Sequence, residues 1–288
     1  MDIMMQTFST IMTSMLAGLA ALAAATTEQA VAADENYVAV TLISEQTGLV
    51  PGKTAWLGIR LQHAPQWHTY WVNPGDSGLP TKLSWSVPYG FIPGQIEWPA
   101  PQRFDVGGLF NFGYAGDVLL PVPIGVSVDA QPGKKAHIAV TATWLVCHEE
   151  CVPGKATLTL DLPVAASAAP EPRWVKAFAD ARAAQPQPAA WSGEARLVGD
   201  SIEVLLRGAG LPSAAKLDAF TPQMRVLANA PPQPVTAGDA LKLTFAKNEY
   251  FAAPPATLDL ILTSTLPPAH AWCVALPFAT APDTSAKP

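Results

Sequence analysis

Apolar and polar residues alternate along most of this chain, and this alternation limits the folds open to it. A repeat of two residues is typical of a β-strand with one buried face. In residues 54–62, TAWLGIRLQ, the apolar face carries Ala55, Leu57, Ile59 and Leu61. Similar runs lie at 36–43, 81–86, 116–126, 136–146 and 155–162, among the chain's 29 prolines and 20 glycines. Short strands joined by Pro- and Gly-rich turns predict an immunoglobulin-like antiparallel β-sandwich for residues 34–165.

A break in this pattern predicts a second domain. Residues 163–173, PVAASAAPEPR, have the composition of a linker. Trp174, Phe178 and Ala181 then follow at helical spacing, so we expect a short helix within the connection 166–189. Alternation returns after residue 190, for example at 201–207 and 241–245. The segment 190–288 therefore predicts a second, smaller β-sandwich with a C-terminal tail, which makes the chain all-β apart from the linking helix.

The N-terminus predicts export to the periplasm. Residues 8–25 are apolar, and AVAADE offers a small-residue cleavage site near Ala33, so 1–33 is predicted to be a cleaved signal peptide. One departure is that residues 1–7 contain Asp2 and no Lys or Arg, where such a signal has a positive start. After residue 33 no apolar run approaches the roughly 18–20 residues of a membrane span, so none is expected in the mature chain.

Charge is sparse in this sequence. Charged residues make up 14% of it, and the formal net charge is −6. Such a chain has no basic footprint for nucleic acid. Neither a flavin nor a nicotinamide motif is present, so no cofactor is predicted.

Two of the chain's three cysteines lie four positions apart in WLVCHEECVPGK, residues 144–155. An extended backbone would separate Cys147 and Cys151 by about 13 Å, at roughly 3.3 Å per residue, whereas a disulfide needs Cα atoms within about 7 Å. The backbone must therefore bend, and we expect the strand to end at Val146 and Pro153-Gly154 to form the turn. In an exported protein the pair favours redox chemistry. A structural disulfide and a metal site using His148 remain alternatives.

The residues around the pair would modulate it. Glu149 and Glu150 disfavour a thiolate, and a protonated His148 favours one; the alternative is a solvated turn. His68 is expected to be a satisfied histidine in an aromatic-rich strand rather than a copper ligand, and NPGDSG, 73–78, a tight loop. Cys273 is expected to be a small buried hydrophobe.

Three stretches together resemble the N-terminal periplasmic domain of DsbD-type thiol:disulfide interchange proteins. They are CHEECVP at the pair, WHTYWVNPGDSGLPTKLSW at 67–85 and YAGDVLLPVPI at 114–124. The resemblance covers about 36–165 and is closer to the ScsB branch, which also spaces its cysteines by three. It implies an immunoglobulin-like thiol:disulfide oxidoreductase domain, and with it a role in copper tolerance or cytochrome c maturation.

The resemblance also implies partners and roles. Electrons would come from a membrane thiol reductase of the DsbD, ScsB or CcdA kind and pass to a periplasmic thioredoxin-fold protein. Cys151 would form the mixed disulfides and Cys147 would resolve them. An aromatic cap would shield the pair, with Phe104, Phe110, Phe112 and Tyr114 as candidates. This chain lacks the family's membrane and thioredoxin domains, so the donor would be another protein. The rival function is a periplasmic metal-binding or protein-interaction module with a structural disulfide.

Overall fold

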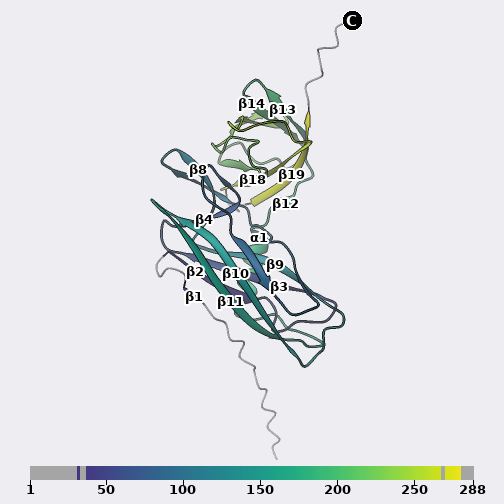
Figure 1. Ribbon diagram of the computed structural model, residues 1–288. Helices are drawn as coiled ribbons and strands as arrows, with labels where there is room; N and C mark the ends of the chain where they lie inside the picture. Colours follow the sequence, from purple (N-terminus) through teal and green to yellow (C-terminus); the bar gives the residue numbers. More distant parts are fainter. Residues whose placement is uncertain (1–30, 33–36, 267–269, 280–288) are drawn as a thin grey trace, which may run out of the picture.

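The computed structural model describes residues 31–32, 37–266 and 270–279, and the predicted cleavage site near Ala33 lies outside them. Within this part the chain is almost entirely β-structure, in three sheets with one α-helix (Figure 1). The all-β fold class predicted from the alternation is therefore confirmed.

The first domain is a sandwich of two antiparallel sheets around one apolar core. The first sheet has the order β1-β2-β3-β9-β6 and consists of β1 (Val31–Ala32), β2 (Val38–Ser44), β3 (Thr54–His63), β9 (Asp117–Val126) and β6 (Phe91–Pro93). The second has the order β11-β10-β4-β8-β7 and consists of β11 (Cys151–Pro163), β10 (Lys135–Cys147), β4 (His68–Gly75), β8 (Leu109–Ala115) and β7 (Gln102–Val106), with β5 (Lys82–Ser86) also paired to β10. The apolar faces predicted for 54–62 and 155–162 are both buried in this core.

The second domain is one continuous sheet around its own core. The order is β15-β18-β19-β13-β14-β17-β16, with β12 beside β19. The strands are β12 (Gln187–Pro188), β13 (Ser192–Val198), β14 (Ser201–Arg207), β15 (Leu217–Phe220), β16 (Gln233–Ala237), β17 (Ala240–Ala246), β18 (Thr257–Ser264) and β19 (His270–Ala279). The end of β19 pairs in parallel with β13, and residues from β14, β17 and β18 meet in the core.

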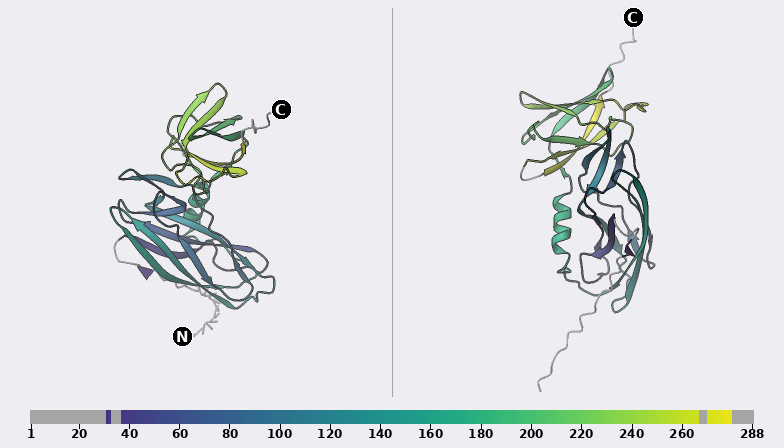
Figure 2. Two further views of the ribbon diagram at one scale, coloured as in Figure 1. Left: turned by 45° about the horizontal axis from the view of Figure 1, so that its top comes forward. Right: turned by 90° about the vertical axis from the view of Figure 1, so that its left-hand side faces the viewer.

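The linking helix α1 (Val175–Ala183) packs on the first domain (Figure 2). Phe178 and Ala181 are its buried residues, as their helical spacing predicted, and they cluster with Ile43 of β2 and Leu119 of β9. Arg182 adds an ion pair to Glu45. The connection between the domains is therefore fixed to the outer face of the first sheet.

The turn between β10 and β11 is not where the sequence predicted it. The two strands pair in register from Lys135↔Pro163 to Cys147↔Cys151, so the turn is 148–150 and Pro153-Gly154 lie inside β11. Proline is tolerated there because β11 is an edge strand. Gly154 packs closely against Trp144, since a Cβ atom at this position would be 2.3 Å from the indole. The long register places the two cysteines opposite each other at the tip of the hairpin.

Candidate active site

The site is built around the disulfide that closes this hairpin. Cys147 and Cys151 are bonded, with Cα atoms 4.2 Å apart. Cys147 is buried, with 2% of its surface exposed, whereas Cys151 is exposed. Between them His148 is half-buried near Trp67, and Glu149 and Glu150 are exposed. The two ends of the disulfide therefore differ in their access to solvent.

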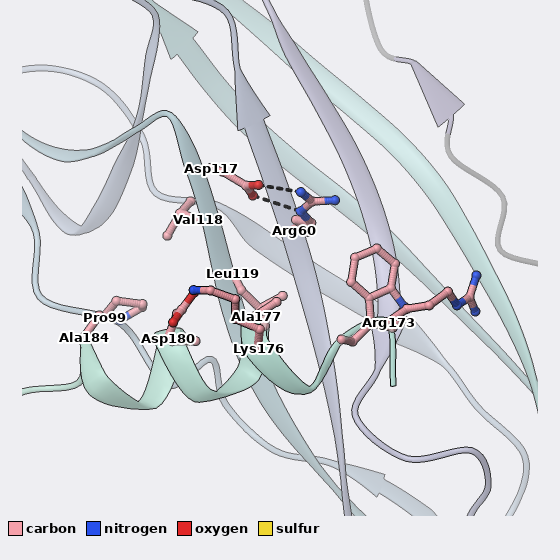
Figure 3. A pocket seen from close by; sticks show the side chains of 12 residues that line it. Arg60, Pro99, Asp117, Val118, Leu119, Arg173, Lys176, Ala177, Asp180 and Ala184 are labelled. Atoms are coloured by element: carbon pink, nitrogen blue, oxygen red, sulfur yellow. Dashed lines mark hydrogen bonds and ion pairs between the residues drawn. The ribbon is translucent and has the colours of Figure 1, made fainter. Parts of the chain in front are cut away.

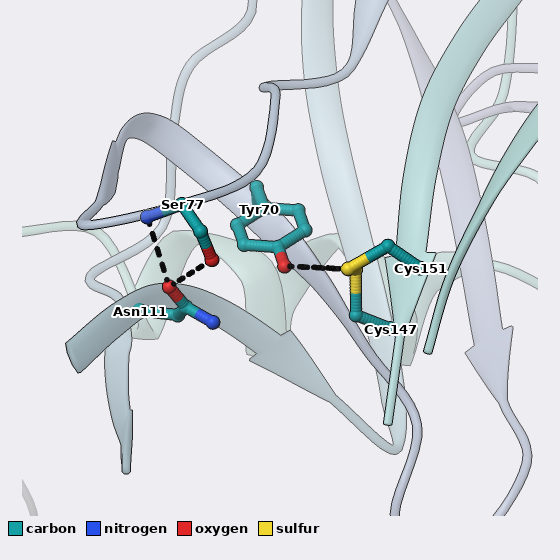
Figure 4. Close-up of a disulfide and its surroundings, with 5 residues drawn as sticks. All are labelled: Tyr70, Ser77, Asn111, Cys147 and Cys151. Atoms are coloured by element: carbon teal, nitrogen blue, oxygen red, sulfur yellow. Dashed lines mark hydrogen bonds between the residues drawn. A yellow bond between two sulfur atoms is a disulfide. The ribbon is translucent and has the colours of Figure 1, made fainter. Parts of the chain in front are cut away.

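Tyr70 on β4 contacts the buried sulfur (Figure 4). Its hydroxyl donates to Cys147 Sγ at 2.8 Å and lies 3.7 Å from Cys151 Sγ. The side chain is fully buried, and burial raises the pKa of Tyr70, so it stays a protonated donor at neutral pH. Its ring fits closely over Gly78, where a Cβ atom would lie 2.2 Å from ring carbons.

The sequence did not point to Tyr70 as a site residue. The only signal available was the strand period, which places Tyr70 on the same face of β4 as His68. That face meets the disulfide because His68 pairs directly with Cys147 across β4 and β10. The pairing joins strands far apart in sequence, so the strand period alone does not reveal it.

His68 is a buried neutral histidine next to the disulfide. Burial, and to a smaller extent the neighbouring His63 and His148, lowers the pKa of His68 to about 4. Its ring stacks on Phe104 with centroids 4.5 Å apart. Its Nε2 atom is buried without a hydrogen-bond partner among the described residues. The expectation of a fully satisfied histidine is therefore wrong, although the residue is packed among aromatic rings as predicted.

Of the four predicted cap residues, Phe104 lies on the disulfide's face of the sheet. On β8, Asn111 pairs with Phe104 and Gly113 pairs with Tyr70, so these residues share the disulfide's face. The other three candidates alternate with them and therefore lie on the opposite face: Phe110, Phe112 and Tyr114. Phe112 is buried and meets the ring of Phe220 at 5.1 Å. Tyr114 is also buried, and its hydroxyl donates to the carbonyl of Pro99 at 2.7 Å. Phe104 is thus the one cap candidate of the four that shares a face with the disulfide.

The loop after β4 ties the site to β8. The Asp76 carboxylate accepts the backbone N–H of Phe110 at 2.7 Å, and the Asp76 backbone N–H donates to the Phe110 carbonyl at 2.9 Å. The Ser77 backbone N–H and hydroxyl both donate to Asn111 Oδ1, at 3.2 and 2.8 Å. These residues make the hydrogen bonds expected of a tight loop, but they direct them across to the neighbouring strand.

A cavity of about 450 Å³ lies apart from these residues, between α1 and β9 (Figure 3). Four of its charged side chains form two ion pairs: Arg60 donates two hydrogen bonds to the carboxylate of Asp117, at 2.9 and 2.5 Å, and Lys176 contacts Asp180 at 2.6 Å. None of the residues around the disulfide lines it. We assign this cavity no part in the chemistry of the pair.

The third cysteine lies in the second domain, away from the pair. Cys273 on β19 is half-buried rather than buried, with Sγ 3.6 Å from the carbonyl oxygen of Pro186, and burial raises the pKa of its thiol.

Among the described residues, no group of three or more His, Cys, Asp and Glu side chains could hold a metal ion. Over the same part of the chain, no helix is both long and apolar enough to cross a membrane.

The fold and the site together define an immunoglobulin-like domain with a disulfide suited to thiol–disulfide exchange. One cysteine is exposed, its partner is buried, and the buried sulfur accepts a hydrogen bond. Residues 39–163 match the family model for the N-terminal part of the thiol:disulfide interchange protein DsbD. The resemblance to the DsbD N-terminal domain that was inferred from the sequence is therefore confirmed over this segment.

Solved structures extend the comparison to the second domain. The N-terminal periplasmic domain of ScsB from Proteus mirabilis superposes with a TM-score of 0.65 at 21% identity, covering 86% of this chain and 96% of that one. The two-domain fold is therefore shared with that structure. The sporulation control protein Spo0M from Bacillus subtilis gives a TM-score of 0.24 at 11% identity, over 84% and 90% of the two chains, which is too distant to inform the fold. No curated protein matches the chain.

Proposed function

We propose that this protein relays reducing equivalents in the periplasm through Cys147 and Cys151. A membrane thiol reductase of the DsbD, ScsB or CcdA kind supplies two electrons, and a thioredoxin-fold protein receives them. The DsbD-type domain and the closely spaced disulfide support thiol–disulfide exchange in general. The periplasmic location is supported by the ScsB structure, which is described as a periplasmic domain. A role in copper tolerance or cytochrome c maturation stays a prediction.

The exposed Cys151 is the sulfur that exchanges with partners. In the reduced protein its thiolate attacks one sulfur of the acceptor's disulfide, a mixed disulfide forms, and the acceptor's other sulfur leaves as a thiolate. The Cys147 thiolate then attacks Cys151 Sγ, which closes the intramolecular disulfide and releases the reduced acceptor. Two electrons and two protons pass to the acceptor in each cycle. The donor regenerates the pair by the reverse sequence, in which Cys147 is the leaving group.

One observation carries this assignment, namely the unequal burial of the two cysteines. A partner's sulfur can approach the exposed Cys151, whereas Cys147 is enclosed and receives the Tyr70 hydroxyl. A hydrogen bond to sulfur stabilises the thiolate and improves it as a leaving group. Burial therefore separates an exchanging sulfur from a resolving one.

The turn residues would tune the exchanging sulfur. Glu149 and Glu150 place negative charge beside Cys151 and disfavour its thiolate, while a protonated His148 favours it. We therefore expect the pair to react slowly with free thiols and faster with a docked partner. Phe104 is the proposed shield of the pair.

Cysteine variants test this proposal. In a Cys273→Ala background, Cys147→Ser should trap a mixed disulfide with a thioredoxin-fold protein through Cys151, and Cys151→Ser should trap none. The trapped species is identified by non-reducing electrophoresis and peptide mass spectrometry. A trap through Cys147 would reverse the assignment.

The reduction potential of the pair separates a relay from the rival structural disulfide. We expect a value within the range of exchange proteins, about −120 to −270 mV. A potential well below about −300 mV would instead indicate a structural bridge.

A further inference from the structure

The β7–β8 hairpin, which carries Phe104, is bound by the second domain through Arg103. This side chain is 8% exposed and makes a bidentate ion pair with Asp218 on β15. Its Nε donates to Asp218 Oδ2 at 3.0 Å, and its Nη2 donates to Asp218 Oδ1 at 2.6 Å. Its guanidinium also donates to the backbone carbonyls of Ala219, at 2.9 Å, and Asn229. Bidentate, charge-assisted contacts of this kind fix geometry as well as adding affinity.

Aromatic packing reinforces the same contact. The Arg103 guanidinium lies 4.7 Å from the ring centroid of Phe112 and 4.9 Å from that of Phe220. Phe220 comes from the second domain, yet it is buried within the core cluster of the first. The hairpin is therefore part of the interface between the domains.

A second connection joins the loop beside Tyr70 to the same domain. Asn229 donates to Asp76 Oδ1 at 2.8 Å, while Asp76 Oδ2 accepts the N–H of Phe110 in the hairpin. Asn73, which is buried, donates to the carbonyl of Thr221 at 2.8 Å. The second domain thus holds both segments that flank the disulfide's face of the sheet.

Adjacent residues of β7 serve the two sides of this arrangement. Arg103 pairs with Phe112 on the face toward the second domain, and Phe104 pairs with Asn111 on the face toward the disulfide. Because the two side chains are adjacent on one short strand, a change in how Arg103 is held would be transmitted to Phe104 through the backbone. The contact between the domains is therefore coupled to Phe104. The ring of Phe104 stacks on His68, and His68 pairs with Cys147 across β4 and β10.

We propose that the second domain is a clamp that holds the β7–β8 hairpin, and with it Phe104, against His68 beside the buried end of the disulfide, with Arg103 as the positioning residue. The proposal deepens and rests on the proposed exchange function, since it assigns the second domain control over access to the pair. Release of the clamp opens the hairpin and uncovers the buried Cys147 end of the disulfide, in addition to the access that thiols already have at Cys151.

The test measures how fast a small dithiol, dithiothreitol, reduces the Cys147–Cys151 disulfide in the full chain with Cys273→Ala. Each turnover converts the reagent to its cyclic disulfide and the two cysteines to thiols. Arg103→Met keeps an apolar side chain between the rings of Phe112 and Phe220 but removes the bidentate ion pair with Asp218. It should raise the reduction rate roughly tenfold by favouring local opening of the hairpin. The matched control is Arg60→Met, which removes a similar Arg–Asp fork within the first domain (Figure 3); its rate should stay at the parent value.

Two further measurements separate positioning from general destabilisation. Hydrogen exchange should accelerate in residues 102–115 of Arg103→Met and not in Arg60→Met. Phe104→Ala should raise the rate as Arg103→Met does, and the double variant should add little, because both act on one opening. If Arg103→Met folds poorly, Asp218→Asn replaces it as the milder variant.

The clamp is refuted if the two arginine variants are reduced at the same rate, or if the Arg103 and Phe104 effects are fully additive. These rates involve no protein partner. A failure of the wild-type protein to exchange with thioredoxin-fold proteins would therefore count against the proposed function and leave the clamp to be judged on its own rates.

Discussion

The hydrogen bond from Tyr70 to Cys147 should set the acidity of the buried thiol, and Tyr70→Phe removes it while keeping the ring. In the reduced protein the hydroxyl, at 2.8 Å from Sγ, is placed to stabilise a thiolate in a buried site. A hydrogen bond to a charged group contributes about 1.5–3 kcal/mol. Since one pKa unit corresponds to about 1.4 kcal/mol, the variant should raise the pKa of Cys147 by roughly one to two units.

The assay follows thiolate absorbance against pH in reduced protein that carries Cys151→Ser and Cys273→Ala, so that Cys147 is the only thiol. Tyr114→Phe is the matched control, because it also removes a buried tyrosine hydrogen bond, to Pro99 at 2.7 Å, from the same domain. Both variants should lose about 1 kcal/mol of stability, but only Tyr70→Phe should shift the thiol titration. Partner exchange through Cys151 should also slow in Tyr70→Phe with both cysteines present, since Cys147 becomes a poorer leaving group.

Two results would refute this reasoning. An unchanged Cys147 titration in Tyr70→Phe would mean that the hydroxyl does not stabilise the thiolate. An equal shift in Tyr114→Phe would mean that the titration reports general loosening of the sandwich.

Three further predictions concern stability and the third thiol. Because the pKa of His68 falls from 6.5 to about 4 on folding, the unfolded state takes up its proton first. The stability contributed by neutral His68 is thus complete above pH 6.5 and is lost towards pH 4, by up to roughly 3 kcal/mol. Urea unfolding across this range should show the loss in the wild type and a flatter profile in His68→Phe; equal slopes would contradict the assignment. Gly78→Ala, at φ +93° and against the Tyr70 ring, should cost about 1–3 kcal/mol in the same assay and displace Tyr70; a neutral effect would show that the close packing is absent. Cys273 should be alkylated slowly in the folded protein and rapidly after unfolding, and Cys273→Ala should exchange normally; fast native labelling or lost exchange would mean that this thiol is functional.

Local periodicity determined much of the fold. The strands at 54–62 and 155–162, and their buried faces, follow from a two-residue repeat that needs no knowledge of neighbouring strands. The helix stripe at Phe178 and Ala181 is local in the same sense. Strand β4 was expected from its aromatic residues alone, because nearly all of it is buried and its sequence shows no alternation of polar and apolar residues.

The amino-acid sequence by itself identified the cysteine pair and favoured redox chemistry for it. Only the tertiary structure decided what surrounds it. The register of β4 against β10 brings Tyr70 to a sulfur 77 residues away, and the packing of the domains brings Asp218 to Arg103 across 115 residues. The first contact depends on which strands pair and in which register, and the second on how the two domains pack. Both are decided by the burial of whole cores rather than by any local run of residues. The same cause leaves Phe104 beside the site and carries Phe112 and Tyr114 into the core.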